Sequence, residues 1–540
     1  MKPVSGMAPR VTIVMTARER HSLAEAAIDS IVAQTPHPYR LVYVDVDSPQ
    51  SLRETFAARA TEWGLEVVRF DEPLWPQPAR VRMSGAIRTE YTLFIDNDVD
   101  VESGWLESLV ACADATGAGI VGPLYLAGDG MQPARIHMAG GRLQETGSPN
   151  ARVFEDTHLL ANADPGEVAD ALVRKPCDFV EYHCMLIRTE LLHAGVLDPA
   201  IRCVHEHIDT SLTARGLGYA TWFEPAARVT YLAHADYMLD ELDFFRNRWT
   251  QEEGDASIAA FCRKWKVMDD ERSFGGVRRF LVDHVAEVDP VRPVARDRAD
   301  HRVAMHASEL RQTRSELLDV ARERGYTRDE LATIANAYHV AQILTDGGYR
   351  PCGRPFINHL AGTASVLARY DFRAEVVAAG LLHSAYTHAP RHAAGAGEAA
   401  RVVCAALGGK GSRLERRVRA YTLREGMSAA TDANFDAATL SVSEAETLAV
   451  IAANELDLYL SGEIRYSGRS DVMAPAAMQP VAHACNALAV NGLVEALHRE
   501  QAHVGSVPRE FVTSVGVSYR IAQDRRTAIP MASSVSGVLP

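Results

Sequence analysis

The chain has 540 residues, of which 47% are hydrophobic and 23% are charged, a balance typical of a globular protein. This length exceeds what one ordinary hydrophobic core holds, so two domains, or three, are expected. The net charge of -14 argues against a nucleic-acid-binding protein, because such a protein needs a basic surface.

Cysteine spacing and the lack of long apolar runs indicate the compartment. No two cysteines form a Cys-x-x-Cys pair, so zinc-ribbon spacing is absent from the sequence, and a disulfide framework is not expected in a chain of this length. No stretch reaches the roughly 18 apolar residues of a membrane helix, and residues 1–10 lack the apolar core of a signal peptide. We therefore expect a soluble, cytoplasmic protein without membrane insertion.

Strand-like and helix-like segments alternate over the first hundred residues. Helices that alternate with strands at this spacing connect parallel strands, so the sequence predicts a Rossmann-like α/β domain with a mostly parallel sheet. No Gly-x-Gly-x-x-Gly loop follows the first strand, so the usual dinucleotide site is not expected. The predicted strands are 11–16, 41–45, 65–70 and 91–100, and the predicted helices are 22–33, 51–63 and 79–89.

The fourth predicted strand ends in an acidic motif, Asp96-Asn97-Asp98, with Asp100 two residues further on. Alternation along an extended backbone places Asp96 and Asp98 on one side, where their charges repel unless a cation lies between them. Carboxylate oxygens suit hard ions such as Mg²⁺ or Mn²⁺, which commonly bind diphosphates as well. The alternative is a strand that ends in a solvated acidic turn, which is the role expected of Asp100.

Polar side chains also follow the first two predicted strands. Thr16 and Arg18 follow the first strand, and Asp45 ends the second. In sheets of this kind ligands bind beyond the carboxyl ends of the strands. Together with the acidic motif, these residues predict a site where carboxylates and a metal ion hold a nucleotide.

With these motifs, residues 9–270 resemble the inverting nucleotide-sugar glycosyltransferases of the large family that includes the cellulose, chitin and hyaluronan synthases, glycosyltransferase family 2 with the GT-A fold. The resemblance rests on Thr16, Asp45 and the Asp-x-Asp motif in their family order. It implies that Asp45 contacts the nucleobase and that the motif, through Asp96 and Asp98, binds the metal and the donor diphosphate. Within the motif we expect Asp98 to be the direct metal ligand and Asp96 to face the donor's ribose or a metal-bound water.

The resemblance extends to residues on either side of this motif. Arg80-x-Arg82 stands where the family often carries an Arg-x-Asn segment near the donor, so both arginines are expected at the donor. The family also carries a late His near the metal. Tyr231 occupies that place here, and His234, three residues on, is expected to be a third metal ligand or else a residue of a surface loop.

A second acidic cluster, His205-Glu206-His207-Ile208-Asp209, precedes a predicted helix, and His207 replaces the Asp that serves as base in the family. An acceptor hydroxyl or thiol must lose a proton while it attacks the anomeric carbon. We favour Glu206 as the base, then Asp209. His207 itself is a third candidate, because the reference pKa of histidine is near neutrality. Alternatively, the carboxylates only stabilise the helix through its dipole.

The pattern becomes nearly all helical in the second half of the chain. The capping boxes Thr327-x-x-Glu330 and Ser441-x-x-Glu444 mark the starts of two helices. Enough sequence follows for an independent helical bundle. The expected boundaries are 9–275 for the α/β glycosyltransferase-like domain, 276–312 for a charged linker, 313–507 for the all-helical domain and 508–540 for a polar, partly disordered tail.

Motifs around His359 and His383 resemble the HD-domain phosphohydrolases, above all the stringent-response enzymes that hydrolyse guanosine tetraphosphate. Those enzymes hold a metal through a His, a His-Asp pair and a later Asp. In this chain Ser384 replaces the paired Asp, and Asn454 replaces the later one. Because a hard metal needs these anionic ligands, the resemblance implies an HD-like fold without the activity.

These motifs together indicate a metal-dependent inverting glycosyltransferase with Mn²⁺ or Mg²⁺ as cofactor. The partners expected are a nucleoside-diphosphate sugar donor, with a preference for a UDP-sugar that follows from the resemblance, and a soluble acceptor, which is a small molecule, a peptide or a glycan. The helical domain would bind the acceptor or form a homodimer. Two alternatives stay open, a bifunctional protein whose HD-like domain hydrolyses a phosphate ester and a catalytically decayed nucleotide-sugar-binding scaffold.

Overall fold

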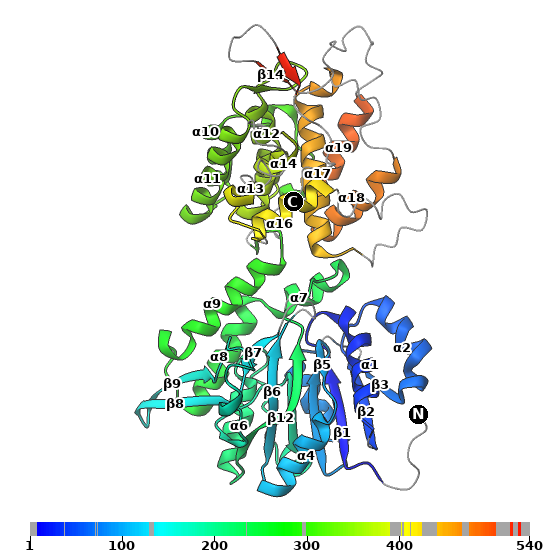
Figure 1. Cartoon of the computed structure of the whole chain (residues 1–540), viewed down its shortest axis with the longest axis vertical. Helices are drawn as coiled ribbons and strands as arrows, with labels where there is room; N and C mark the ends of the chain where they lie inside the picture. Colours follow the sequence, from blue (N-terminus) through cyan, green and yellow to red (C-terminus); the bar gives the residue numbers. More distant parts are fainter. Residues whose placement is uncertain are drawn as a thin grey trace. The chain divides into compact units, whose positions relative to one another are not determined.

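The chain divides into two compact units, residues 1–285 and 286–540, which are described separately (Figure 1). No helix among the described residues is both long enough and apolar enough to span a membrane. The computed structural model describes residues 8–36, 38–70, 72, 74–128, 134–233, 235–293, 299–388, 401, 404–410, 412–423, 440–466, 475–503, 519–521 and 528–530.

A ten-stranded sheet forms the centre of the first unit. Its strands are β1 (Val11–Thr16), β2 (Tyr39–Asp45), β3 (Leu65–Arg69), β4 (Tyr91–Asp96), β5 (Val99–Val101), β6 (Ile120–Ala127), β7 (Arg135–Met138), β10 (Lys175–Cys177), β11 (Cys184–Arg188) and β12 (Thr221–Tyr231). They lie in the order β10-β12-β6-β11-β4-β1-β2-β3, with β5 paired to β12 and β7 paired to β6.

The four strands predicted from the alternating pattern are parallel neighbours. Strand β1 pairs in parallel with β2 and β4, and β2 pairs in parallel with β3, which confirms the α/β fold class. All residues of β1 and β4 are buried, as their unbroken apolar sequences predict for strands covered on both faces. Beyond β4 the sheet is mixed, because β11 runs antiparallel to both β4 and β6.

Helices connect and cover these strands. The predicted helix at 79–89 begins earlier, because proline is favoured in a first helical turn, and it ends at Ser84. The helices of this unit are α1 (Ala24–Gln34), α2 (Gln50–Trp63), α3 (Pro76–Ser84), α4 (Trp105–Thr116), α5 (Thr189–His193), α6 (Glu206–Gly216), α7 (Leu242–Arg248) and α8 (Gln251–Trp265), followed by α9 (Glu271–Val288), in which the unit ends.

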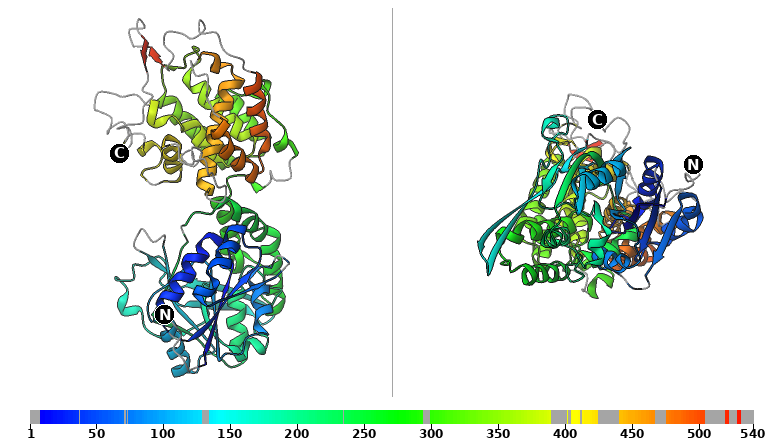
Figure 2. Two further views of the ribbon diagram at one scale, coloured as in Figure 1. Left: turned by 90° about the vertical axis from the view of Figure 1, so that its right-hand side faces the viewer. Right: turned by 90° about the horizontal axis from the view of Figure 1, so that it is seen from below.

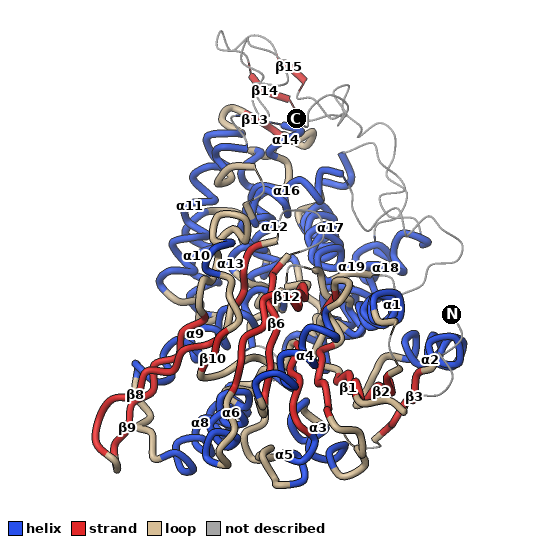
Figure 3. Tube along the Cα trace, turned by 60° about the horizontal axis from the view of Figure 1, so that its bottom comes forward, coloured by secondary structure: helices blue, strands red, loops and turns tan. Residues whose placement is uncertain are grey.

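A two-stranded antiparallel ribbon, β8 (Gly141–Ser148) and β9 (Ala151–His158), extends beyond the main sheet (Figure 3). Its turn requires glycine at position 147, where φ is +93° and a Cβ would lie 2.2 Å from the carbonyl oxygen of Ala151. Residues at the end of β9, including His158, contribute to the cavity described below.

The second unit is nearly all helical, as predicted (Figure 2). Both predicted capping boxes are present, at Thr327 with Glu330 and at Ser441 with Glu444. The helices are α10 (Arg314–Glu323), α11 (Arg328–Leu344), α12 (Phe356–Arg369), α13 (Ala374–Leu382), α14 (Ala385–His388), α16 (Arg413–Leu423), α17 (Val442–Leu460), α18 (Pro475–Ala487) and α19 (Asn491–His503).

Parts of the segments predicted as a linker, 276–312, and as a tail, 508–540, have regular or buried structure. In the charged segment 276–312, α9 continues to Val288, and His301 and Met305 are buried in the second unit. The imidazole Nε2 of His301 lies 2.8 Å from the carboxylate of Asp371, so part of the charge is paired inside the fold. Of the segment 508–540, the structure describes strands β14 (Tyr519–Ile521) and β15 (Ala528–Pro530), and β14 pairs with both β15 and β13 (Gly348–Tyr349).

The side chain of His21, just before α1, is buried. Neither ring nitrogen has a partner among the described residues, and the ring contacts Phe244 edge-on at 4.8 Å between centroids. Burial lowers the pKa of His21 from 6.5 to about 4. Below pH 6.5 this histidine is protonated in the unfolded chain, but in the folded chain it is protonated only below about pH 4. The free energy of unfolding therefore decreases as the pH falls from 6.5 to 4, and above pH 6.5 this residue has no effect on it.

We therefore predict that His21→Phe reduces the loss of stability between pH 6.5 and pH 4, by up to about 3 kcal/mol. Urea unfolding at several pH values would measure it. All 6 tryptophans lie in the first unit, so tryptophan fluorescence reports its unfolding alone. Identical pH dependence of wild type and variant would contradict the prediction.

Candidate functional site

The acidic motif Asp96-Asn97-Asp98 is buried at the carboxyl edge of the sheet, and each of its residues is at most 2% exposed. The Asn97 side chain joins the motif to the loop after β1. Its Oδ1 accepts a hydrogen bond from the backbone N–H of Arg18 at 2.8 Å, and its amide nitrogen donates to the carbonyls of Glu19 at 2.8 Å and Arg20 at 2.9 Å. The motif and this loop therefore form one structure.

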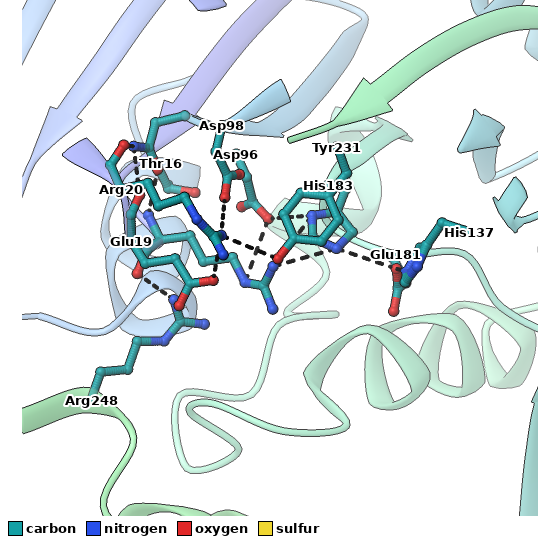
Figure 4. Close-up of polar contacts among 12 residues, drawn as sticks. Thr16, Glu19, Arg20, Asp96, Asp98, His137, Glu181, His183, Tyr231 and Arg248 are labelled. Carbon is teal, nitrogen blue, oxygen red and sulfur yellow. Dashed lines mark hydrogen bonds and ion pairs between the residues drawn. The ribbon is translucent and has the colours of Figure 1, made fainter. Parts of the chain in front are cut away.

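Asp96 is surrounded by basic and polar groups (Figure 4). Arg80 Nη2 donates to its Oδ1 at 3.1 Å, His183 Nδ1 lies 3.1 Å from its Oδ2, and Arg18 Nε lies 3.9 Å away. Burial by itself would raise the pKa of Asp96, but the hydrogen bond with His183 and the charges of Arg80 and Arg18 hold this pKa below its usual range. Asp96 is therefore a buried carboxylate that stays ionised.

Asp98 is buried completely and is only partly satisfied. Arg20 Nη1 donates to Oδ2 at 3.2 Å, whereas Oδ1 has no hydrogen-bond partner among the described residues. Burial raises the pKa of Asp98 to about 6, against the lowering effect of the charges of Arg20 and Arg18. A buried acceptor without a partner is costly, and a cation would satisfy it.

The side chains of Asp96, Asp98 and His183 fit a divalent metal ion. One ligand atom from each lies within 4.8 Å of the others, and the free Oδ1 of Asp98 is the buried oxygen that lacks a partner. Carboxylate and imidazole ligands together suit ions such as Mn²⁺. His234, predicted as the third ligand, lies outside the described residues. Asp100 is half-buried in β5, where it pairs with β12.

A cavity of 740 Å³, a size typical of small-molecule sites, is lined by Asp96 and by many charged side chains. Its lining comes from the loop after β1, from α3, β7 and the ends of β4, β9, β12 and α7, and from the segment before β11, the start of α6 and the first half of α9. The charged and histidine side chains that line it are Arg18, Arg80, Asp96, His137, Glu155, Asp156, His158, Glu181, His183, His205, Glu206, His207, Arg248, Glu271, Arg272 and Arg279.

Two arginines of the cavity have unused hydrogen-bond donors. Among the described residues, Nε and Nη1 of Arg80 and Nε of Arg248 are buried without a hydrogen-bond partner. Arg80 is fixed in place by Thr16 Oγ1 at 3.4 Å from its Nη2 and by the ring of Tyr182, whose centroid lies 3.9 Å from the guanidinium carbon. Buried guanidinium donors without partners favour the binding of an anion.

Two of the predicted donor-binding residues lie away from this cavity. Asp45 is buried, but its carboxylate accepts a hydrogen bond from the backbone of Ser48 at 3.0 Å and lies 3.7 Å from Arg69 Nε, and it does not line the cavity. Arg82 is exposed and pairs with Glu72. Because α3 turns by about 100° per residue, Arg80 and Arg82 cannot face the same site.

The three candidate bases are separated by the geometry of α6. Glu206 and His207 line the cavity, and no hydrogen bond or ion pair to the Glu206 carboxylate occurs among the described residues. Asp209 lies one turn further and does not line it. Its carboxylate instead binds Lys264 Nζ at 2.8 Å and Trp265 Nε1 at 2.7 Å. Asp209 therefore ties α6 to the end of α8.

Several residues of the cavity escaped the sequence-based prediction. His183 is brought to Asp96 because β11 pairs antiparallel with β4, and the backbone N–H of Asp96 donates to the carbonyl of His183 at 3.3 Å. Glu181 and His137 lie beside it. The only signal in the sequence was a pair of polar residues, Glu181 and His183, directly before an apolar strand. Arg20 belongs to the charged run after β1, of which only Arg18 was assigned.

In the second unit, the two histidines of the HD-like motif do meet. The rings of His359 and His383 lie edge to face with centroids 5.3 Å apart. Asp457, on α17, binds His359 Nδ1 at 2.6 Å and accepts two hydrogen bonds from Arg354, at 2.8 and 3.0 Å. Gly362 allows α12 to approach this carboxylate, since a Cβ there would lie 1.8 Å from Asp457 Oδ1.

The other two residues of the predicted HD-like site take no part in this pairing. Ser384 follows His383 and is buried, and the amide of Asn454 donates to Glu455 Oε1 at 3.2 Å. One ligand atom each of His359, Asp457 and Glu463 lies close enough together for a metal ion, but Arg354 pairs with both carboxylates. A guanidinium therefore supplies the positive charge there.

A family model of known proteins matches part of the first unit. Residues 12–192 match the family model described as Glycosyl transferase family 2. A stretch of 127 residues, 22% of this chain, is 32% identical to the O-antigen biosynthesis protein RfbC of Myxococcus xanthus. The match spans only 10% of that protein. The match to the glycosyltransferase family model therefore covers most of the first unit but less than half of the chain.

Three solved glycosyltransferase structures are similar to this chain at low sequence identity. GalNAc-T7 with UDP, GalNAc and Mn²⁺ is 17% identical with a TM-score of 0.36, over 51% of this chain and 54% of that one. The mannosyltransferase PcManGT from Pyrobaculum calidifontis, in complex with GDP-Man and Mn²⁺, is 17% identical with a TM-score of 0.30, over 46% and 65%. TarS of S. aureus with UDP-GlcNAc is 14% identical with a TM-score of 0.29, over 60% and 86%. Likeness at this level supports no inference about function.

We predict that Asp209 and Glu206 differ in their contributions to stability. Asp209→Ala removes both hydrogen bonds to α8 and should lower the free energy of unfolding of the first unit by about 1–3 kcal/mol. Glu206→Ala, the matched control three residues away, should change it by less than about 0.5 kcal/mol. Urea unfolding followed by tryptophan fluorescence measures both, and equal losses would refute the assignment of a structural role to Asp209.

Proposed function

We propose that the first unit is a metal-dependent, inverting glycosyltransferase that moves a sugar from a nucleoside-diphosphate sugar to an acceptor in the same cavity. One observation carries this proposal. The cavity is lined by Arg80 and Arg248, whose guanidinium groups have unused donors, by Asp96 of the acidic motif, and by Glu206, whose carboxylate pairs with none of the described residues. The guanidinium N–H groups can bind the diphosphate leaving group. The Glu206 carboxylate can accept the proton of an acceptor hydroxyl. The match to a glycosyltransferase family model supports the same reading.

In this proposal Asp96, Asp98 and His183 hold Mn²⁺ or Mg²⁺. When bound, the ion neutralises negative charge that develops on the leaving diphosphate, an effect worth several kcal/mol. Arg80 and Arg248 contact the diphosphate through the N–H groups that lack partners in the protein. Because these donors are already fixed by Thr16, Asp96 and the surrounding fold, little reorganisation opposes their action.

Glu206 is the proposed general base. Its carboxylate takes the proton from the acceptor hydroxyl while the hydroxyl oxygen bonds to the anomeric carbon and the bond from that carbon to the diphosphate breaks. Attack opposite to the leaving group inverts the anomeric configuration. His207, the next residue along α6, also lines the cavity and is the second candidate. Asp209 contributes by holding α6, and with it Glu206, against α8.

The donor and acceptor are proposed at the level of chemical class. The preference for a UDP-sugar follows from the family resemblance, in which Asp45 would contact the base. The helical unit would bind the acceptor or pair two copies of the chain. Hydrolysis of a phosphate ester in that unit is a second candidate function, favoured by the grouping of His359, Asp457 and Glu463. We favour the noncatalytic role because Arg354 neutralises Asp457.

Replacing Asp98, whose buried Oδ1 lacks a hydrogen-bond partner among the described residues, tests the metal-dependent step. We predict that Asp98→Asn lowers Mn²⁺-dependent turnover of its nucleoside-diphosphate sugar by about 10²–10³-fold, because it removes the only carboxylate with an unsatisfied buried oxygen in the motif. Nucleotide release from a panel of such sugars, with and without Mn²⁺, is the measurement. Asp100→Asn is the matched control and should keep full turnover. Unchanged turnover in Asp98→Asn would contradict the proposal. If the wild type turns over none of the donors, the alternative of a nucleotide-sugar-binding scaffold is supported instead.

Replacement of the proposed base tests the acceptor step. Glu206→Gln keeps the size of the side chain and removes its charge, so we predict a decrease in kcat for transfer of about 10²–10⁴-fold. Donor affinity, measured by the donor-induced rise in Tm, should stay within about twofold. If His207→Gln abolishes transfer and Glu206→Gln does not, then His207 is the base.

A further inference from the structure

A second group of metal-ligating side chains lies on the cavity wall beside Asp96. His137 on β7 and both Glu181 and His183 before β11 place one ligand atom each within 4.8 Å of the others. Nε2 of His137 is 2.7 Å from Oε2 of Glu181, and Nε2 of His183 is 3.5 Å from the same oxygen (Figure 4). All three residues line the cavity.

The two ring nitrogens of His183 face different acidic groups. Nδ1 lies 3.1 Å from Asp96, whereas Nε2 points to Glu181. The ring therefore presents one nitrogen to Asp96 and the other to Glu181. Stacking on Tyr231, at 4.0 Å between centroids, keeps the ring in this orientation.

We propose that His137, Glu181 and His183 form a second metal site, for a borderline divalent ion such as Zn²⁺ or Co²⁺. Two imidazoles and one carboxylate are the ligand set of many zinc centres whose fourth position binds water or substrate. Here that position would open to the cavity. The site shares His183 with the one formed with Asp96 and Asp98, but its other two ligands are different. It goes beyond glycosyl transfer, on which it does not depend.

Two neighbours fit this site. His158 Nε2 lies 3.5 Å from the other oxygen of Glu181 and would orient the carboxylate, as the outer partners of metal ligands commonly do. Arg18 Nη1 lies 3.4 Å from His183 Nε2 and competes with an ion for the lone pair. Arg18 also pairs with Asp96 at 3.9 Å, so it has an alternative partner when an ion binds.

Cobalt binding tests this site without any assay of enzyme activity. The full chain, without an affinity tag and stripped of metal with a chelator, is titrated with Co²⁺ while visible absorption is recorded, and bound Co²⁺ is then displaced with Zn²⁺. We expect a saturable absorption band in the wild type and in Asp98→Asn. His137→Ala and Glu181→Gln should lose the band or bind Co²⁺ at least about 10-fold more weakly, whereas the surface control His193→Ala should not.

The outcomes separate the two metal sites. Wild-type affinity in His137→Ala and in Glu181→Gln, or no saturable band in the wild type, overturns the second site. Loss of the band in Asp98→Asn together with its retention in His137→Ala also overturns it, because the ion would then lie at Asp96 and Asp98. Tryptophan fluorescence verifies that each variant is folded, and His137→Asn replaces His137→Ala if the latter unfolds. Donor turnover with Mn²⁺ is measured separately, so failure of the glycosyltransferase proposal is recognised independently.

Discussion

The pairing of buried carboxylates with arginines at the edge of the sheet is the constraint on which the first unit depends. Burying an ionised group is costly unless an opposite charge and hydrogen bonds compensate it. Asp96 obtains this compensation from Arg80, and Asp98 obtains it from Arg20. Glu19 obtains it from Arg20 and from Trp249 Nε1 at 2.7 Å. The partners come from α3, from the loop after β1 and from the end of α7, so satisfying these charges fixes three distant segments around one cavity.

The sequence predicted the parts of this site that depend on local pattern. Strands β1 to β4 have unbroken or alternating apolar residues, and parallel strands joined by helices place their ends at one edge. Asp96, Asp98 and Arg18 could therefore be assigned to the site in advance. His183 could not, because its place beside Asp96 depends on the antiparallel pairing of β11, which joins segments far apart in the sequence. Local pattern likewise cannot tell which of two acids on a helix faces a cavity, as Glu206 and Asp209 illustrate.

The helical unit brings the two histidines of the predicted motif together, but with a different acid beside them. The motif comparison correctly placed His359 and His383 together, but it looked for the missing acid at Asn454. The carboxylate beside His359 comes from Asp457, almost one helical turn later on α17. Arg354 donates two hydrogen bonds to it, which is the geometry that makes arginine a strong carboxylate partner. Close packing of α12 at Gly362 leaves no room for a larger residue there.

The central residue of the acidic motif is constrained as tightly as the two acids beside it. Asn97 donates two hydrogen bonds and accepts one, all to the backbone of three consecutive residues. Aspartate at this position would offer only acceptors to two carbonyl oxygens and would add a third buried negative charge. Spontaneous deamidation of this one side chain would therefore convert a folded site into one that repels its own loop. The middle residue of the Asp-x-Asp pattern is therefore one at which the protein cannot tolerate deamidation, and complete burial of Asn97 shields the amide from water.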